Sequence, residues 1–185
     1  MTSPVSVGGD ERLRLFLALR LPEPVLDGLE DWQRRSLHGV RAVARDDLHL
    51  TLAFLGHRPA LELDGIVGEL RAAAAAAAPD LRLTPARYRE TRGAAMLVLD
   101  DEGGRVTALA DDLQVRLERL GVFRREARPW LPHVTVARFR ERPRLRPEPA
   151  RLEPFAPSDA AAYLSRLRPT GAQYEVLGSV ALGGR

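Results

Sequence analysis

One pattern occurs twice in this chain, and it restricts the folds that the chain can adopt. A His-x-Thr triplet stands inside an apolar strand in LHLTLAFLG, which contains His49, and again in PHVTVARF, which contains His133. Each triplet follows an earlier strand, opening at Arg14 or at Met96, at a similar distance, and a helical segment lies between. A unit that occurs only twice does not make a solenoid, which needs about three repeats. The repeat therefore predicts two similar lobes related by approximate twofold symmetry.

Hydrophobic periodicity, together with Pro and Gly, predicts the other elements. Helices are expected in residues 22–37, 63–80 and 103–122, and strands in residues 14–21, 81–90, 94–100 and on either side of a Pro-Thr-Gly turn within residues 161–182. Residues 140–154 read as a loop rich in Pro and Arg. We expect a disordered tail in residues 1–11 and a single bilobal domain in residues 12–185.

Composition narrows the class of protein. The 185 residues are 45% hydrophobic, which is enough for one compact domain or for two small lobes that share a core. The chain has no cysteine, which excludes disulfides and thiolate chemistry. Neither a long apolar stretch nor a signal-like N-terminus is evident, so we expect a cytoplasmic protein with no membrane span. All 28 basic residues are arginine, and composition bias is the simplest explanation for most of them.

Strand alternation predicts how the first triplet is oriented. Successive side chains of a strand point to opposite faces, so His49, Thr51 and Ala53 share one face, while Phe54 joins the leucines on the other. The second triplet follows the same rule. Each lobe would then bury an apolar face and present one imidazole beside one hydroxyl. Across a twofold axis these two faces meet in a central cleft.

Two imidazoles and two hydroxyls suit the chemistry of a phosphoester. Imidazole titrates near neutral pH, so one ring can accept a proton from water while the other donates one to the leaving oxygen. Threonine hydroxyls, here Thr51 and Thr135, can stabilise the charge on phosphate oxygens. A zinc site needs three or four ligands. Asp46 and Asp47 precede the first triplet, but no carboxylate accompanies the second. We therefore expect neither a metal nor another cofactor.

The paired HLTL and HVTV segments resemble the two signatures of the 2H phosphoesterases, and most closely those of the RNA 2′,3′-cyclic phosphodiesterases, also called 2′-5′ RNA ligases. RLFLAL, LHLTLAFLG, RPWLPHVTVAR and SRLRPTGAQYEVL carry the likeness over nearly the whole chain. The resemblance implies an α+β bilobal fold, antiparallel sheets lining a central cleft, and no metal. It implies opening of a 2′,3′-cyclic phosphate to a 2′-phosphate, with His49 as the acid and His133 assisting the attacking water.

The same resemblance implies that Arg138 binds the phosphate. Alternation places Arg138 on the opposite face from His133, so a bulge or a strand end is required. Arg128 fits a structural role just before the site, and Tyr174 is a candidate for the wall of the cleft. For Phe54 and Trp130, core packing is favoured over stacking on a base, and the remaining histidines, His38 and His57, read as surface residues.

Two other functions stay open at this point. The same two histidines could join RNA ends through 2′-5′ linkages, or the chain could be a module that binds RNA or nucleotide phosphates without catalysis. The expected partner in each case is an RNA or a nucleotide, with a 2′,3′-cyclic phosphate if the protein is an enzyme. We expect a monomer. The arginines of residues 138–151 read equally well as contacts for an RNA backbone or as a solvated loop.

Overall fold

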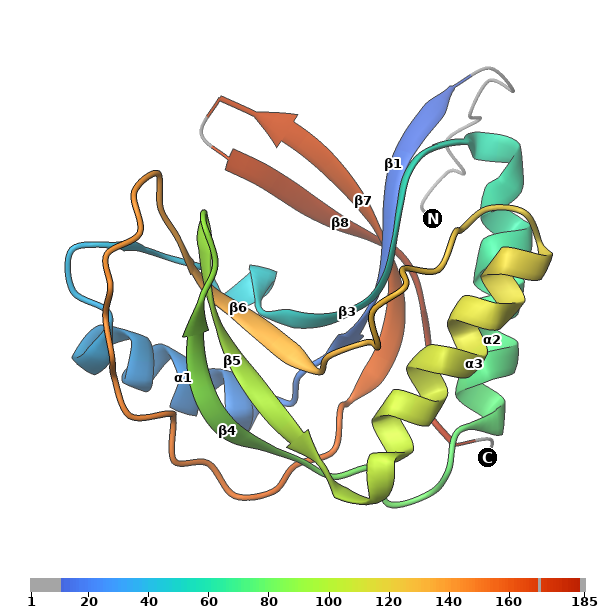
Figure 1. Ribbon diagram of the computed structural model, residues 1–185. Coiled ribbons are helices and arrows are strands. Elements are labelled where there is room, and N and C mark those ends of the chain that lie inside the picture. The colour runs from blue at the N-terminus through green and yellow to red at the C-terminus, as the bar shows by residue number, and fades with distance from the viewer. Residues whose placement is uncertain (1–10, 170, 184–185) are drawn as a thin grey trace, which may run out of the picture.

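The computed structural model describes residues 11–169 and 171–183, so all of the predicted tail except Glu11 lies outside the described residues. Two antiparallel sheets of four strands each flank the middle of the molecule, and helices pack around them (Figure 1). The first sheet has the order β3-β1-β7-β8, with bounds His49–Pro59, Arg12–Arg20, Asp159–Arg168 and Gly171–Val180. The second has the order β2-β6-β5-β4, with bounds Arg41–Ala42, His133–Arg138, Ala94–Asp101 and Leu83–Glu90. This confirms the predicted α+β bilobal arrangement.

The predicted repeat is visible in the strand pairing. β1 leads through helix α1 (Glu23–Ser36) to β3, and these two strands pair antiparallel. β5 leads through helix α3 (Arg105–Arg119) to β6, and these two also pair antiparallel. The short strand β2 departs from the repeat, because it comes from the first half of the chain but pairs with β6 in the second sheet. The lobes are therefore linked by main-chain hydrogen bonds.

Helices α2 (Leu63–Ala76) and α3 pack against each other on one side of the molecule (Figure 1). The buried face of α3, within the helix expected in residues 103–122, carries Leu109, Leu113 and Leu117 at helical spacing. The helix ends in a Schellman motif, in which Gly121, with φ +79°, donates to the Glu118 carbonyl and the next amide donates to that of Leu117. Glycine adopts this left-handed conformation without strain, which explains its position after the helix.

Side chains from both sheets form one continuous hydrophobic core, with Leu17 and Leu50 on one side and Leu97 and Val134 on the other. A second, smaller cluster lies on the opposite face of the first sheet, where Phe16, Ala18, Ala161 and Tyr163 are buried. Both faces of β1 are therefore covered. Within the described ranges no helix is long and apolar enough to cross a membrane.

A β-bulge interrupts the alternation after each His-x-Thr triplet. On β3, Ala18 pairs with Thr51 but Leu17 pairs with Ala53, so one residue of β3 is left over. On β6, Met96 pairs with Thr135 but Ala95 pairs with Ala137, so one residue of β6 is left over. An extra residue in one strand reverses the faces of everything beyond it. The two bulges lie at equivalent positions of the repeat.

The bulges correct the expected orientation of two residues. Ala53 is buried, whereas Phe54 is 47% exposed and lies on the face of His49, so the predicted alternation and the core-packing interpretation of Phe54 are both wrong. On β6 the bulge returns Arg138 to the face of His133, which supplies the irregularity that its predicted role required. Phe54 and Arg138 thus occupy the same position in the two halves of the repeat.

Candidate active site

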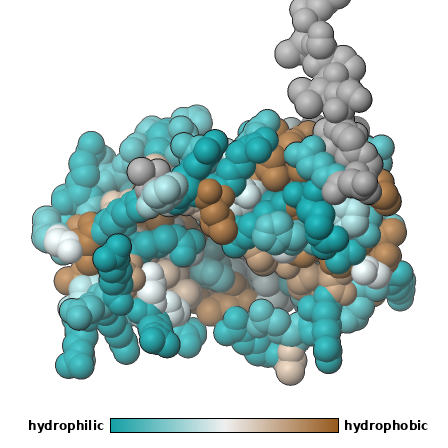
Figure 2. All heavy atoms as spheres, turned by 90° about the horizontal axis from the view of Figure 1, so that it is seen from above, coloured by the Kyte–Doolittle hydropathy of each residue, from teal (hydrophilic) through white to brown (hydrophobic). Residues whose placement is uncertain are grey.

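A cleft between the two sheets contains the predicted site residues. One hollow of about 450 Å³ is lined by His49, Thr51, Thr135 and Arg138, together with Phe54. A second hollow, of about 840 Å³, is lined by His133, and it shares Thr51 and Phe54 with the first. The molecule is largely hydrophilic on the face seen from above, and a hollow lies between its two sides (Figure 2). The structure therefore brings all five predicted residues to two adjoining hollows of one cleft.

Each histidine is oriented by the main chain two residues before it. The Nδ1 atom of His133 lies 2.8 Å from the carbonyl oxygen of Leu131. Because only a protonated nitrogen can donate to a carbonyl, Nδ1 carries a proton and Nε2 of the neutral ring is free to accept one. His49 hydrogen-bonds the main chain of Asp47, and its Nε2 lies 3.1 Å from Oγ1 of Thr51. The two rings thus share the same local design.

The surroundings of His49 disfavour its charged form. Burial lowers its pKa to about 4, against the raising effect of the hydrogen bond to Asp47, and the charges of Arg138 and His133 lower it further. Aromatic rings provide the apolar surroundings, with Phe16, Tyr163 and Tyr174 centred 5.0, 5.8 and 5.5 Å from the imidazole. The ring is therefore neutral at pH 7 in the free protein.

Buried glutamines support both bulges. Gln33 on α1 donates from Nε2 to the carbonyl oxygens of Val43 and Val136, at 3.0 and 2.9 Å. Gln114 on α3 donates from Nε2 to the carbonyl oxygen of Leu52 at 2.8 Å. Leu52 and Val136 each follow the threonine of a triplet. Each bulge is therefore held by the helix that belongs to the other half of the repeat.

Phe54 lines both hollows, and an arginine lies over its ring. The guanidinium carbon of Arg14 lies 4.6 Å from the centre of the Phe54 ring, within the range of a cation–π contact. Arg14 also donates from Nη1 to the hydroxyl of Ser165 at 2.6 Å. Both Arg14 and Ser165 line the hollow of His49, as does Arg41. Sequence reasoning missed these three residues, although the position of Arg14 on a strand next to β3 was available as a signal.

An acidic side chain also lines this hollow. Burial raises the pKa of Asp47, and the neighbouring charge of Asp46 adds to this effect, whereas Arg138 and Arg41 oppose it. Across the described ranges, His, Asp and Glu side chains nowhere gather in a group of three or more that could hold a metal ion. His49, His133 and Asp47 are thus side chains of the cleft that could donate or accept a proton.

Other residues that the sequence singled out lie in the cleft, beside it or on the surface. Tyr174 lines the hollow of His49, and His38 and His57 are exposed, as expected. Trp130 packs partly against the core and donates from Nε1 to the carbonyl oxygen of Thr51 at 3.0 Å. Arg128 is exposed and forms an ion pair with Glu126, two residues before it, and both line the second hollow.

Comparisons with known proteins agree with this geometry. A Thermus thermophilus protein named RNA 2′,3′-cyclic phosphodiesterase is 33% identical over 184 residues, which span 93% of this chain and 91% of that protein. The crystal structure of TT0787 from Thermus thermophilus has 31% identity and a TM-score of 0.79, covering 94% of this chain and 100% of that one. Escherichia coli LigT complexed with 3′-AMP has 25% identity and a TM-score of 0.78, with coverages of 94% and 99%. The model of the 2′-5′ RNA ligase superfamily matches residues 21–168, and the chain belongs to this family.

Proposed function

We propose that this protein hydrolyses 2′,3′-cyclic phosphate ends of RNA to 2′-phosphates, using His49 and His133 and no metal ion. The observation that carries the proposal is the presence of two equivalent imidazole–hydroxyl pairs in one cleft, each fixed by its own strand and bulge. The curated relative from Thermus thermophilus is named for this activity, which adds support.

The proposed reaction needs one base and one acid on opposite sides of the phosphorus. His133 accepts a proton from water at its free Nε2, and the water oxygen forms a bond to phosphorus. The bond from phosphorus to the ribose 3′ oxygen breaks, and His49 gives that oxygen a proton. Hydroxyls of Thr51 and Thr135 and the guanidinium of Arg138 hold the phosphate oxygens while negative charge builds on them.

The low pKa of His49 adds a condition to this assignment. A neutral imidazole cannot act as the acid, so His49 must take up a proton when the substrate binds. An anionic phosphate beside the ring favours the imidazolium, and it also offsets the charge of Arg138, which lowers the pKa of His49 in the empty cleft. We infer that binding of the cyclic phosphate and protonation of His49 are coupled.

Product analysis tests the proposal. Metal-stripped protein in excess chelator is incubated with an oligonucleotide ending in a 2′,3′-cyclic phosphate, and the ends formed are identified. A 2′-phosphate is expected, because the 3′ oxygen is the leaving group. A 3′-phosphate, or activity that requires a divalent ion, would overturn the mechanism. Longer products joined by 2′-5′ linkages in the presence of 5′-hydroxyl ends would show that the same site runs in reverse.

A further inference from the structure

Two arginines of the second sheet lie on the same face as the second triplet. Through directly paired residues of β5, Arg87 on β4 is connected to His133 on β6, and Arg89 is connected to Thr135. Directly paired residues of antiparallel strands point to the same side, and adjacent strands are about 4.8 Å apart. The sheet face that carries His133 and Thr135 therefore continues across β5 to Arg87 and Arg89, which lie about 10 Å from β6.

Within the part of the chain that the structure describes, these arginines have no partner that neutralises them. Both are exposed, and among residues 11–169 and 171–183 neither guanidinium makes an ion pair or hydrogen bond. Both line the hollow of His133, to which the loop after α3 adds Arg124 and Arg128. Among the described residues, Glu126 is the one acidic residue that lines that hollow, and it is paired with Arg128. Positive charge thus accumulates on the side of the cleft that holds His133.

The Pro/Arg-rich loop extends this charge beyond the edge strand β4. Glu90, whose carboxylate is 2% exposed, accepts hydrogen bonds from Nε of Arg142 at 3.0 Å and from the amides of Arg144 and Leu145 at 3.0 and 2.7 Å. The hydroxyl of Tyr88 adds a fourth bond at 2.9 Å. Burial would raise the pKa of Glu90, but these hydrogen bonds hold it below its usual value.

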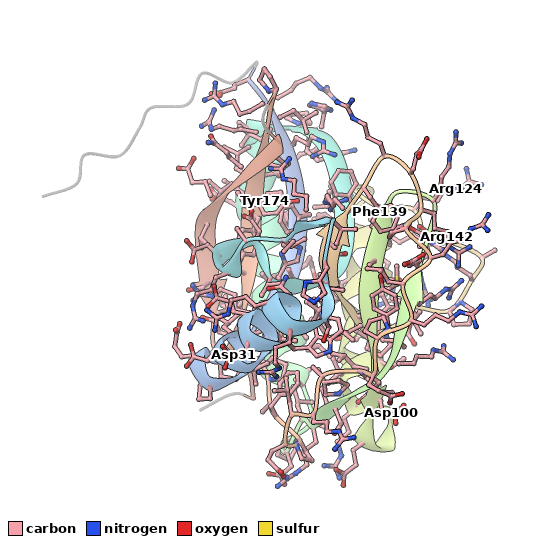
Figure 3. The ribbon with its side chains drawn as sticks, turned by 90° about the vertical axis from the view of Figure 1, so that its left-hand side faces the viewer. Asp31, Asp100, Arg124, Phe139, Arg142 and Tyr174 are labelled. Carbon is pink, nitrogen blue, oxygen red and sulfur yellow. The ribbon has the colours of Figure 1, made fainter. Side chains whose placement is uncertain are left out.

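Because Glu90 lies on β4, the loop is fixed beside Arg87 and Arg89. These two residues also line a third hollow, together with Arg142, Arg144 and Arg146. Figure 3 shows Arg124 and Arg142, which come from different loops, projecting on the same side of the molecule. The second and third hollows share Arg87 and Arg89, so one continuous surface leads from His133 to the loop.

We propose that this surface, the arginine track, binds the single-stranded RNA that leads to the reacting end. It consists of Arg87, Arg89, Arg124, Arg128, Arg142, Arg144 and Arg146. The proposal rests on the proposed function, because it places the cyclic phosphate in the cleft and the preceding nucleotides on the track. Seven arginines face two glutamates, and both glutamates already have partners, so an added polyanion relieves repulsion among the guanidinium groups.

The track fits a backbone rather than a particular base sequence. Guanidinium groups bind phosphate oxygens in pairs, and contacts with phosphates carry no sequence information. Binding to the track should therefore depend on the length of the RNA and on salt, and very little on its sequence. A mononucleotide with a 2′,3′-cyclic phosphate has a single phosphate, which the proposed reaction places at the two triplets, so it offers the track no further phosphate.

The test compares the variant R87Q/R89Q with the matched variant R71Q/R119Q. Arg71 and Arg119 are exposed on α2 and α3 and line none of the three hollows. The value of kcat/KM is measured for a cyclic mononucleotide and for an oligonucleotide of about eight residues, a length within the span of single-strand sites. Affinity for the same oligonucleotide with a terminal 3′-phosphate is measured in parallel by fluorescence anisotropy over a range of salt.

R87Q/R89Q should lower the ratio of oligonucleotide to mononucleotide kcat/KM about tenfold or more, and R71Q/R119Q should not change it. Each lost phosphate contact reduces the slope of log K against log salt by about 0.7, so the double variant should reduce it by about 1.4. If R87Q/R89Q leaves both the kcat/KM ratio and the salt slope unchanged, or if R71Q/R119Q has an equal effect, the arginine track does not bind RNA as proposed. If the wild type turns over neither substrate, the proposed function fails, while the anisotropy series still decides whether the track binds RNA.

Discussion

Gln33 and Gln114 connect the two halves of the repeat crosswise. Gln33 on α1 donates to the bulge carbonyl that follows the second triplet, and Gln114 on α3 donates to the one that follows the first. Both side chains are buried, with 4% and 9% exposure. Since each bulge turns a residue toward the cleft, these two helices help to set the geometry of the strands opposite them.

Replacing Gln114 with methionine should destabilise the protein by about 1–3 kcal/mol, because the change removes a donor from a buried carbonyl oxygen. The free energy of unfolding is measured by denaturant titration. The matched change, Gln173→Met, alters an exposed residue of β8 and should have little effect. Equal stability of the Gln114 variant and the wild type would show that the hydrogen bond from Gln114 to Leu52 contributes nothing to folding stability.

The pH dependence of turnover should separate the free protein from its complex. The value of kcat/KM reports groups in the free enzyme, where His133 must be neutral while His49 is charged, so the profile of His49 alone is read in the His133→Ala variant. With His49 as the acid, log(kcat/KM) of that variant should fall by about one unit per pH unit above the pKa of about 4. The value of kcat reports the complex, in which the phosphate favours the charged ring, and should stay level to higher pH. Initial rates across a pH series provide both. A plateau of kcat/KM through pH 7 in the His133→Ala variant would instead make His49 the base.

Folding stability should also depend on His49 in mildly acid solution. Its pKa is about 4 in the folded protein and near 6.5 when unfolded, so between these values the unfolded chain binds more protons. The contribution of His49 to stability is therefore complete above pH 6.5 and is lost as the pH falls toward 4, by up to about 3 kcal/mol. His49→Gln should flatten this part of the curve. Parallel curves for variant and wild type would contradict the burial of a neutral ring.

Removing the charge of Arg138 should have two separable effects. Arg138→Gln loses a charged hydrogen bond to phosphate, which should raise KM about 10- to 100-fold. It also removes a charge that lowers the pKa of His49, so the part of the kcat/KM profile that reports this pKa should shift to higher pH. Arg138→Lys keeps the charge but not the planar guanidinium group, and should raise KM without shifting the profile. A shift of the profile in both variants would point to a rearranged cleft.

Much of the fold was predictable because its signals are local. Alternating residues identify β3 and β6 as strands, and the leucine spacing of α3 with Gly121 identifies a helix and its end. The presence of two similar units, each ending in a His-x-Thr strand, follows from the duplicated order of elements. The family resemblance supplied the expectation that Arg138 belongs to the site.

The remaining features depend on contacts between distant segments. The bulges arise from pairing with β1 and β5 and from glutamines on other helices, so the exposure of Phe54 could not be read from its own strand. The two residues of β2 are too few to give a periodic signal. The position of the Pro/Arg-rich loop follows from Glu90, a single carboxylate on another strand.

The most direct test of the account is the initial rate on a 2′,3′-cyclic phosphate oligonucleotide near pH 7, in chelator, for His49→Ala, His133→Ala, the double variant and His38→Ala. His38 is exposed and outside the cleft, so its change controls for the loss of a histidine. Each cleft variant should be slower by about 10²–10⁴-fold. The double variant should be far less damaged than the product of the two single effects, because groups that act as one unit are not additive. Near-normal turnover by a folded His49→Ala or His133→Ala protein would contradict the account.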